Sequence, residues 1–179
     1  MYIRFYIKRN YFMRNYIFLI LVVISSLNIK AQESEVTTYY FIRHAEKSRT
    51  DSTDKNPNLT EKGNKRAKNW SVVFKNITFD FVYSTNYNRT IQTATPTAKN
   101  NNLEIQFYNP RELYNKEFKL KTTGKTVLVV GHSNTTPHFV NKVLDKEKYL
   151  AIDDGNNSNL YIVTIVDNQI STILLKIEH

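Results

Sequence analysis

The residues best suited to chemistry are an arginine and a histidine, Arg43-His44, at the end of an apolar run from Thr38 to Ile42. β-Branched and aromatic residues of this kind are typical of a short buried strand. In an open α/β sheet, ligands bind beyond the carboxyl ends of the parallel strands. A neutral imidazole beside a guanidinium suits attack on phosphorus, with the arginine holding the phosphoryl oxygens. Taken alone, the pair would also fit a solvated surface position, so the prediction depends on other residues.

Two further strand ends carry residues of the same kind. Phe79 to Ser84 reads as a second strand, and Arg89 opens the helix expected after it. Thr126 to Val130 is continuously apolar, as in a strand buried on both faces, and Gly131-His132-Ser133 follows at once. We therefore expect side chains from three strand ends to meet at one edge of a sheet.

A helix should follow the second histidine. Thr136 is placed as its N-cap and Pro137 as its first residue, and we expect the helix to run to about Leu144. Free N–H groups and the positive end of the helix would then face His132 and favour an anion there. His138 lies inside this helix, where a packed or surface histidine is the simpler interpretation than a catalytic one.

The elements that must position these residues alternate between strand and helix. A helix should begin at an N-cap Thr60 and bury Ala67, Trp70, Val73 and Phe74, while Gly63 in its first turn suggests a close approach to the backbone. A second helix, Thr90 to Lys99, should be kinked or shortened by Pro96.

The remaining segments complete the expected fold. Leu103 to Phe107 is predicted as an edge strand, and residues 111–124, which are charged and irregular, are assigned nothing beyond one possible helical turn. Leu160 to Val166 and Gln169 to Ile177 are predicted to form a hairpin. The pattern favours a single α/β domain, residues 32–179, built as a three-layer α/β/α sandwich with a mostly parallel central sheet and a C-terminal hairpin.

Composition excludes some partners. The chain has 179 residues, 25 Lys and Arg against 16 Asp and Glu, and no Cys. Five of the basic residues and none of the acidic ones lie in residues 1–31, so the rest carries 20 basic against 16 acidic residues. No basic run with interleaved aromatic residues is present, and we expect no nucleic-acid partner.

Residues 1–31 read as a signal peptide. A basic segment ends at Arg14, an apolar run extends from Tyr16 to Ile24, and cleavage after Ala31 is expected. The apolar run is short for a membrane span, which needs about 20 residues. We therefore expect a periplasmic or secreted protein that contacts a membrane only if this segment stays uncleaved, with translation starting at Met1 or Met13.

Four motifs in a fixed order resemble the histidine phosphatase superfamily, also called the phosphoglycerate-mutase-like family. They are Arg43-His44-Ala45, Leu59-Thr60-Glu61-Lys62-Gly63, Arg89-Thr90-Ile91-Gln92-Thr93-Ala94 and Gly131-His132-Ser133. With a signal peptide removed, the chain lacks room for the additional subdomain of cofactor-dependent mutases. It is therefore more similar to the short branch that includes phosphohistidine phosphatases.

The resemblance implies a metal-independent, cofactor-free phosphatase that forms a phosphohistidine on His44. Arg43, Arg89, His132 and Ser133 would bind the phosphate of a small phosphorylated substrate or a phosphopeptide. We expect the two arginines to keep His44 unprotonated by a modest lowering of its pKa.

The proton donor to the leaving group is left open by the sequence. Glu112 lies where mutase-like members often carry their acid, and Glu117, Asp153 and Asp154 are rivals. A phosphoramidate would need no dedicated acid, because its leaving nitrogen is basic. Two other functions compete, a phosphoglycerate or phosphosugar mutase and a non-catalytic protein that binds a phosphorylated ligand.

Overall fold

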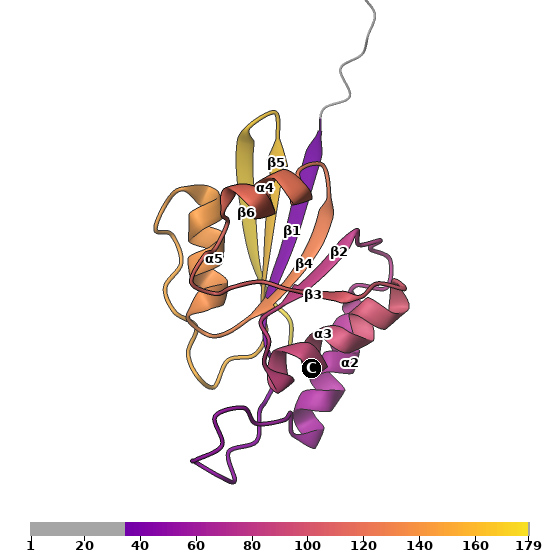
Figure 1. Cartoon of the computed structure of the whole chain (residues 1–179), viewed down its shortest axis with the longest axis vertical. Helices are drawn as coiled ribbons and strands as arrows, with labels where there is room; N and C mark the ends of the chain where they lie inside the picture. The colour runs from indigo at the N-terminus through magenta and orange to yellow at the C-terminus, as the bar shows by residue number, and fades with distance from the viewer. Residues whose placement is uncertain (1–34, 179) are drawn as a thin grey trace, which may run out of the picture. The chain divides into compact units, whose positions relative to one another are not determined.

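The central element of the fold is a six-stranded sheet in the order β3-β2-β4-β1-β5-β6 (Figure 1). The fold is taken from a computed structural model that describes residues 35–178. Four neighbouring strands are parallel: β3 (Ile105–Phe107), β2 (Phe81–Ser84), β4 (Thr126–Gly131) and β1 (Val36–Arg43). The antiparallel pair β5 (Asn159–Val166) and β6 (Gln169–Lys176) completes the sheet beside β1. The predicted mostly parallel sheet with a C-terminal hairpin is confirmed.

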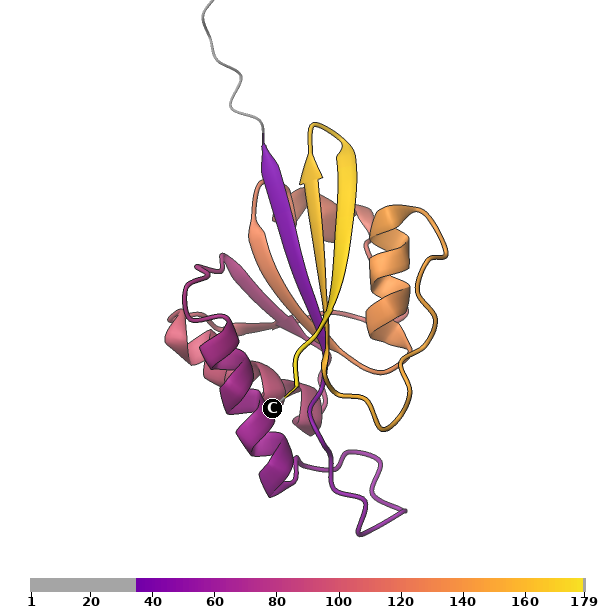
Figure 2. The same ribbon diagram turned by 180° about the vertical axis from the view of Figure 1, so that it is seen from behind.

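Helices cover both faces of the sheet, which confirms the predicted three layers (Figures 1 and 2). On one face, α2 (Glu61–Val73), its C-cap Phe74 and α3 (Asn88–Asn100) bury Trp70, Phe74, Ala94 and Ala98 against the strands. On the other face, α4 (Lys116–Thr122) and α5 (Thr135–Leu144) bury a second apolar cluster. The central strand β4 contributes to both clusters, as its continuous apolar run predicts.

The start of α2 is built as the sequence predicts. Thr60 is its N-cap, and the threonine hydroxyl accepts a hydrogen bond from the backbone N–H of Gly63 at 3.0 Å. A Cβ atom added at Gly63 would collide with the backbone carbonyl oxygen of Glu46. The same carbonyl accepts the backbone N–H of Thr60 at 2.9 Å. The glycine is therefore required because two backbone segments touch here.

Three helix predictions were wrong in detail. Pro96 does not shorten α3, which continues to Asn100 because Thr97 and Ala98 pack into the core beyond it. Residues 116–122 form a full helix capped by the Asn115 side chain, although the segment carries mostly charged residues. α5 begins at Thr135, so Pro137 is its third residue rather than its first.

One predicted core position is also wrong. Val73 is 38% exposed at the end of α2, whereas Arg66 on the same helix is buried. Arg66 turns inward because its guanidinium forms a two-pronged ion pair with Glu46, at 2.8 to 3.0 Å. A pattern of apolar residues cannot reveal a buried position that an ion pair occupies.

The expected signal peptide, residues 1–31, lies outside the described residues. Within residues 35–178, no helix has the length and apolar character needed to cross a membrane.

Candidate active site

The two motif histidines meet at the carboxyl ends of adjacent strands. β1 and β4 pair in parallel with Arg43 opposite Gly131, and the backbone N–H of His44 donates to the Gly131 carbonyl at 2.9 Å. The rings of His44 and His132 consequently lie 5.5 Å apart, centre to centre, at 66°. One phosphoryl group can touch both rings at that separation.

His44 is held in one tautomer. Its Nδ1 atom lies 2.7 Å from the carbonyl oxygen of Ala45, and because a carbonyl only accepts, Nδ1 carries the proton. The lone pair is then on Nε2. The side-chain amide of Asn157 donates to the His44 carbonyl at 2.8 Å and fixes the backbone at this position.

Burial lowers the pKa of His44 to about 3, and the charges of Arg43 and Arg89 act in the same direction. The bond to Ala45 opposes this shift without reversing it. The lowering is larger than the modest effect we expected from the arginines, because removing the ring from water is its largest cause. His44 is therefore unprotonated at neutral pH, as a nucleophile must be.

His132 is also neutral. Its Nε2 atom lies 2.9 Å from the hydroxyl of Thr85, a residue at the end of β2. Burial lowers the pKa of His132 to about 4, and the charges of Arg89, Arg43 and Lys47 add to this lowering. Nδ1 of His132 has no hydrogen-bond partner among the described residues, so it remains available to a ligand.

Arg43 is anchored by the loop before β5. One terminal nitrogen donates to the backbone carbonyls of Asp153, Asp154 and Asn156 at 2.8 to 3.0 Å. The other donates to a carboxylate oxygen of Asp154 at 2.7 Å. Only Nε is left without a partner within residues 35–178. The guanidinium is therefore held rigidly at the site.

Arg89, the first-turn arginine of α3, has more free donors. Its Nε and one terminal nitrogen are buried and have no partner in the described part of the chain. The guanidinium carbon lies 4.5 Å from the centre of the Tyr87 ring, which orients it. Buried N–H groups without acceptors are costly and rare in native proteins, so an anionic ligand is the natural partner here.

These side chains surround a hollow of about 340 Å³. It is lined by Arg43, His44, Lys47, Tyr87, Arg89, Pro110, His132, Ser133, Asn134, Thr135 and Asp154. We call it the phosphoryl hollow. Its wall includes Thr135, the first residue of α5, so the N-terminus of this helix borders the hollow as expected, although the helix begins two residues earlier than predicted. The structure thus brings together Arg43, His44, Arg89, His132 and Ser133.

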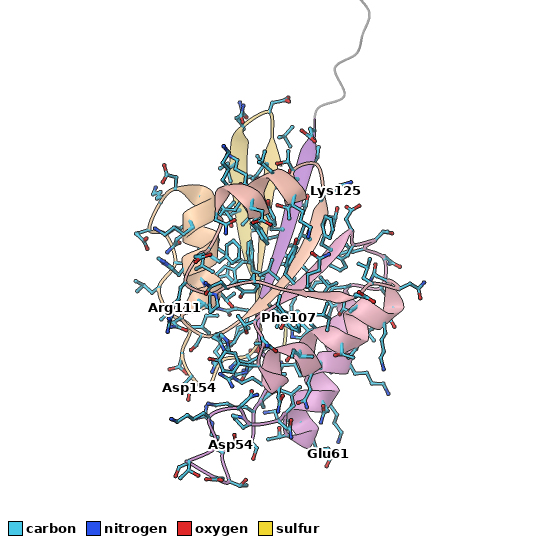
Figure 3. All side chains as sticks on the ribbon, in the orientation of Figure 1. Asp54, Glu61, Phe107, Arg111, Lys125 and Asp154 are labelled. Carbon is cyan, nitrogen blue, oxygen red and sulfur yellow. The ribbon has the colours of Figure 1, made fainter. Side chains whose placement is uncertain are left out.

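A second hollow, also of about 340 Å³, adjoins the first. The two share Arg43, His44, Lys47 and Asp154, and the second adds Glu46, Arg49, Gly155 and Asn157. We call it the outer hollow. In Figure 3, Asp154 lies at the end of the sheet from which the loop of Asp54 projects.

The candidate proton donors are scattered. Glu112 and Glu117 are exposed and line a separate hollow beside β3, together with Phe107 and Phe118. Asp153 contributes its backbone carbonyl to Arg43. Asp154 alone of the four borders the phosphoryl hollow, where hydrogen bonds from Arg43 and Arg49 lower its pKa. Among the described residues, no three His, Cys, Asp or Glu side chains cluster as metal ligands would.

Four site residues were missed by sequence reasoning: Lys47, Thr85, Tyr87 and Asn157. Lys47 directly follows the first motif, and Thr85 and Tyr87 lie in the turn before Arg89, so proximity to a motif was an available signal. Asn157 had none, because it comes from a loop 113 residues beyond His44.

Comparison with known proteins agrees with this geometry. Residues 39–110 match the family model described as the histidine phosphatase superfamily, branch 1. The match includes Arg43-His44 and Arg89, and the strand that presents His132 follows it in the same sheet. The predicted resemblance to this superfamily is confirmed.

Solved structures share the fold at low sequence identity. Phosphoglycerate mutase from Bacillus anthracis has a TM-score of 0.59 and 19% identity over 80% of this chain and 94% of its own. The protein histidine phosphatase SixA, complexed with tungstate, has a TM-score of 0.59 and 15% identity over 78% and 96%. A mutant phosphoserine phosphatase from Entamoeba histolytica, in complex with phosphoserine, has a TM-score of 0.57 and 16% identity over 76% and 94%. No curated protein sequence matches the chain.

Proposed function

We propose that this protein is a phosphatase that hydrolyses a phosphomonoester or phosphoramidate through a phosphohistidine on His44. The observation that carries the proposal is the unprotonated Nε2 of a buried His44 beside the unpaired N–H groups of Arg89. A binding protein would need the cationic donors. It would not need an imidazole held neutral with its lone pair free.

The reaction has two displacement steps. Nε2 of His44 attacks phosphorus, and the bond to the leaving oxygen or nitrogen breaks as the phosphoryl group moves to the ring. Water then attacks the phosphohistidine, which releases inorganic phosphate and restores the neutral ring. Arg43, Arg89 and His132 stabilise charge on the phosphoryl oxygens, and each preorganised donor contributes roughly 3 kcal/mol to such a transition state.

The carboxyl groups near His44 favour substrates with good or basic leaving groups. Glu46 and Asp154 line the hollows, and hydrogen bonds from arginines lower the pKa of each. At neutral pH both are ionised and poorly suited to donate a proton to the leaving group. A phosphoramidate meets this condition because its nitrogen takes a proton readily, so a phosphohistidine-type substrate, free or in a peptide, fits the site.

Covalent trapping tests the proposal. Wild-type protein incubated with phosphoramidate and quenched at alkaline pH should carry an acid-labile phosphoryl group, which mass spectrometry places on His44. His44→Ala should lose the adduct and turnover while keeping phosphate affinity, because Arg43, Arg89 and His132 remain. Arg89→Ala should weaken binding and rate together. Near-normal phosphate release by His44→Ala would overturn the covalent mechanism.

We also propose that the protein is exported and that residues 1–31 are removed. This proposal rests on the basic, apolar and small-residue segments of the sequence. Mass spectrometry of the native protein should find Gln32 at the N-terminus. Recovery of an intact N-terminus at Met1 or Met13 from the cytosol would contradict it.

A further inference from the structure

Lys47 is a cationic residue to which the proposed reaction gives no role. It borders both the phosphoryl hollow and the outer hollow. Its ammonium has no hydrogen-bond or ion-pair partner among residues 35–178. The carboxylates of the two hollows are already matched, Glu46 by Arg66 and Asp154 by Arg43 and Arg49.

The backbone on either side of Lys47 is fixed. Lys47 forms an isolated antiparallel bridge with Leu59, and the N–H of Ser48 donates to the Asn58 carbonyl at 2.8 Å. Both Glu46 and Lys47 border the outer hollow, but the Glu46 carboxylate is paired with Arg66 on α2. Lys47 also borders the phosphoryl hollow, which Glu46 does not.

The electrostatic surroundings agree with this placement. Burial and the charges of Arg89, Arg49 and Arg43 lower the pKa of Lys47, and Asp154 only partly opposes them. The Lys47 charge in turn lowers the pKa of His132. Lys47 thus shares the phosphoryl hollow with Arg89 and His132, and its ammonium has no ion-pair partner in the described part of the chain. An additional ligand anion would relieve this unbalanced positive charge.

We propose that Lys47 forms a second anion subsite between the two hollows, which selects substrates bearing a further acidic group close to the phosphoryl group. The proposal rests on the proposed phosphatase function and names its substrate class. Arg43, Arg89 and His132 hold the transferred phosphoryl group, while Lys47 pairs with a carboxylate or second phosphate on the leaving group.

A matched pair of substrates tests this subsite. Carboxymethyl phosphate and ethyl phosphate differ only in a carboxylate that replaces a methyl group. The wild-type kcat/KM should be about tenfold or more higher for carboxymethyl phosphate than for ethyl phosphate. This is the effect of one charge-assisted hydrogen bond in a partly buried site. Lys47→Met should bring the ratio of the two kcat/KM values close to one, and Lys47→Arg should keep most of the preference.

The control is Lys75→Met. Lys75 is an exposed lysine just beyond the C-terminal end of α2, and it does not line the phosphoryl hollow or the outer hollow. The Lys75→Met variant loses the same formal charge as Lys47→Met. Its ratio of the two kcat/KM values should equal that of the wild type. A wild type without preference, or a Lys47→Met variant that loses equally on both substrates, would overturn the subsite.

Binding of two non-hydrolysable acids separates this inference from the catalytic one. Calorimetry should give wild-type protein a tighter Kd for phosphonoacetate than for ethylphosphonate, and Lys47→Met should remove the difference. If no phosphate compound is turned over while this difference is present, the phosphatase proposal fails and the subsite stands. If turnover occurs and the difference is missing, the subsite alone fails.

Discussion

The hydroxyl of Thr85 lies 2.9 Å from Nε2 of His132, so this contact occupies one ring nitrogen of a histidine that lines the phosphoryl hollow. Thr85→Val keeps the shape of the side chain and removes this contact. We expect kcat/KM to fall roughly tenfold, the effect of losing one buried hydrogen bond. Thr85→Ser should recover most of the loss.

Nitrogen chemical shifts of the His132 ring provide a readout that a general loss of stability would not move. They should report one tautomer in the wild type and a mixture in Thr85→Val. Unchanged shifts together with unchanged kcat/KM would show that Thr85 does not position His132.

The identity of the proton donor can be tested by changing the leaving group. Asp154→Asn should lower the KM for p-nitrophenyl phosphate about threefold, because Asp154 partly neutralises Arg43 and Arg49 at the site. If Asp154 donated a proton, Asn would instead slow an alkyl phosphate far more than p-nitrophenyl phosphate, whose leaving group needs no proton. Glu112→Gln, assayed with the same two substrates, tests the other candidate.

Acid should destabilise the folded protein through its two buried histidines. The pKa of His44 is about 3 and that of His132 about 4 in the folded state, against 6.5 for an ordinary histidine. Between those values the unfolded chain binds more protons, so the free energy of unfolding falls as pH falls. The slope is at most about 1.4 kcal/mol per pH unit for each histidine.

Urea denaturation between pH 7 and pH 4 measures this slope. His132→Gln removes one titrating group, so its stability should fall less steeply with acid than that of the wild type. Parallel curves for the two proteins would contradict the assignment of a lowered pKa to His132.

Gly63→Ala should destabilise the protein despite the higher helix propensity of alanine. Propensity alone predicts a gain of about 1 kcal/mol in a helix. The added Cβ would collide with the Glu46 carbonyl oxygen, and overpacking of this kind costs roughly 1 to 3 kcal/mol. Gly155→Ala is the matched control, because its Cβ would meet only a side-chain oxygen of Asp153 at 3.2 Å. A higher Tm for Gly63→Ala than for the wild type would refute the close contact.

The strands and their ends were predictable because their signals are local. The apolar run before Arg43 and the continuous apolar β4 each identify a strand, and residues that follow parallel strands must share one edge. The course of α3 through Pro96 was not predictable, because packing of the residues beyond the proline outweighs a local preference. The helix α4 was missed for a similar reason, since its capping Asn115 stands before a charged segment with only Phe118 and Thr122 buried.

The site was predictable in its motif residues and not in its supporting contacts. Residue type and spacing in the motifs identify Arg43, His44, Arg89 and His132. The loop before β5 holds Arg43 mainly through backbone carbonyls, which residues of any type could supply. Asn157 and Asp154 become site residues only when the loop before β5 folds back over β1.

The place of β1 in the sheet has a consequence for how the protein acquires its structure. β1 is the first described element of the chain, yet its neighbours are β4 and β5, which come late in the sequence. During synthesis it has no partner until Thr126–Gly131 has been made, and contacts between such distant segments form slowly. A nascent or truncated chain therefore holds His44 on an unpaired strand. We expect phosphatase activity to appear only when the last third of the chain has been made and folded.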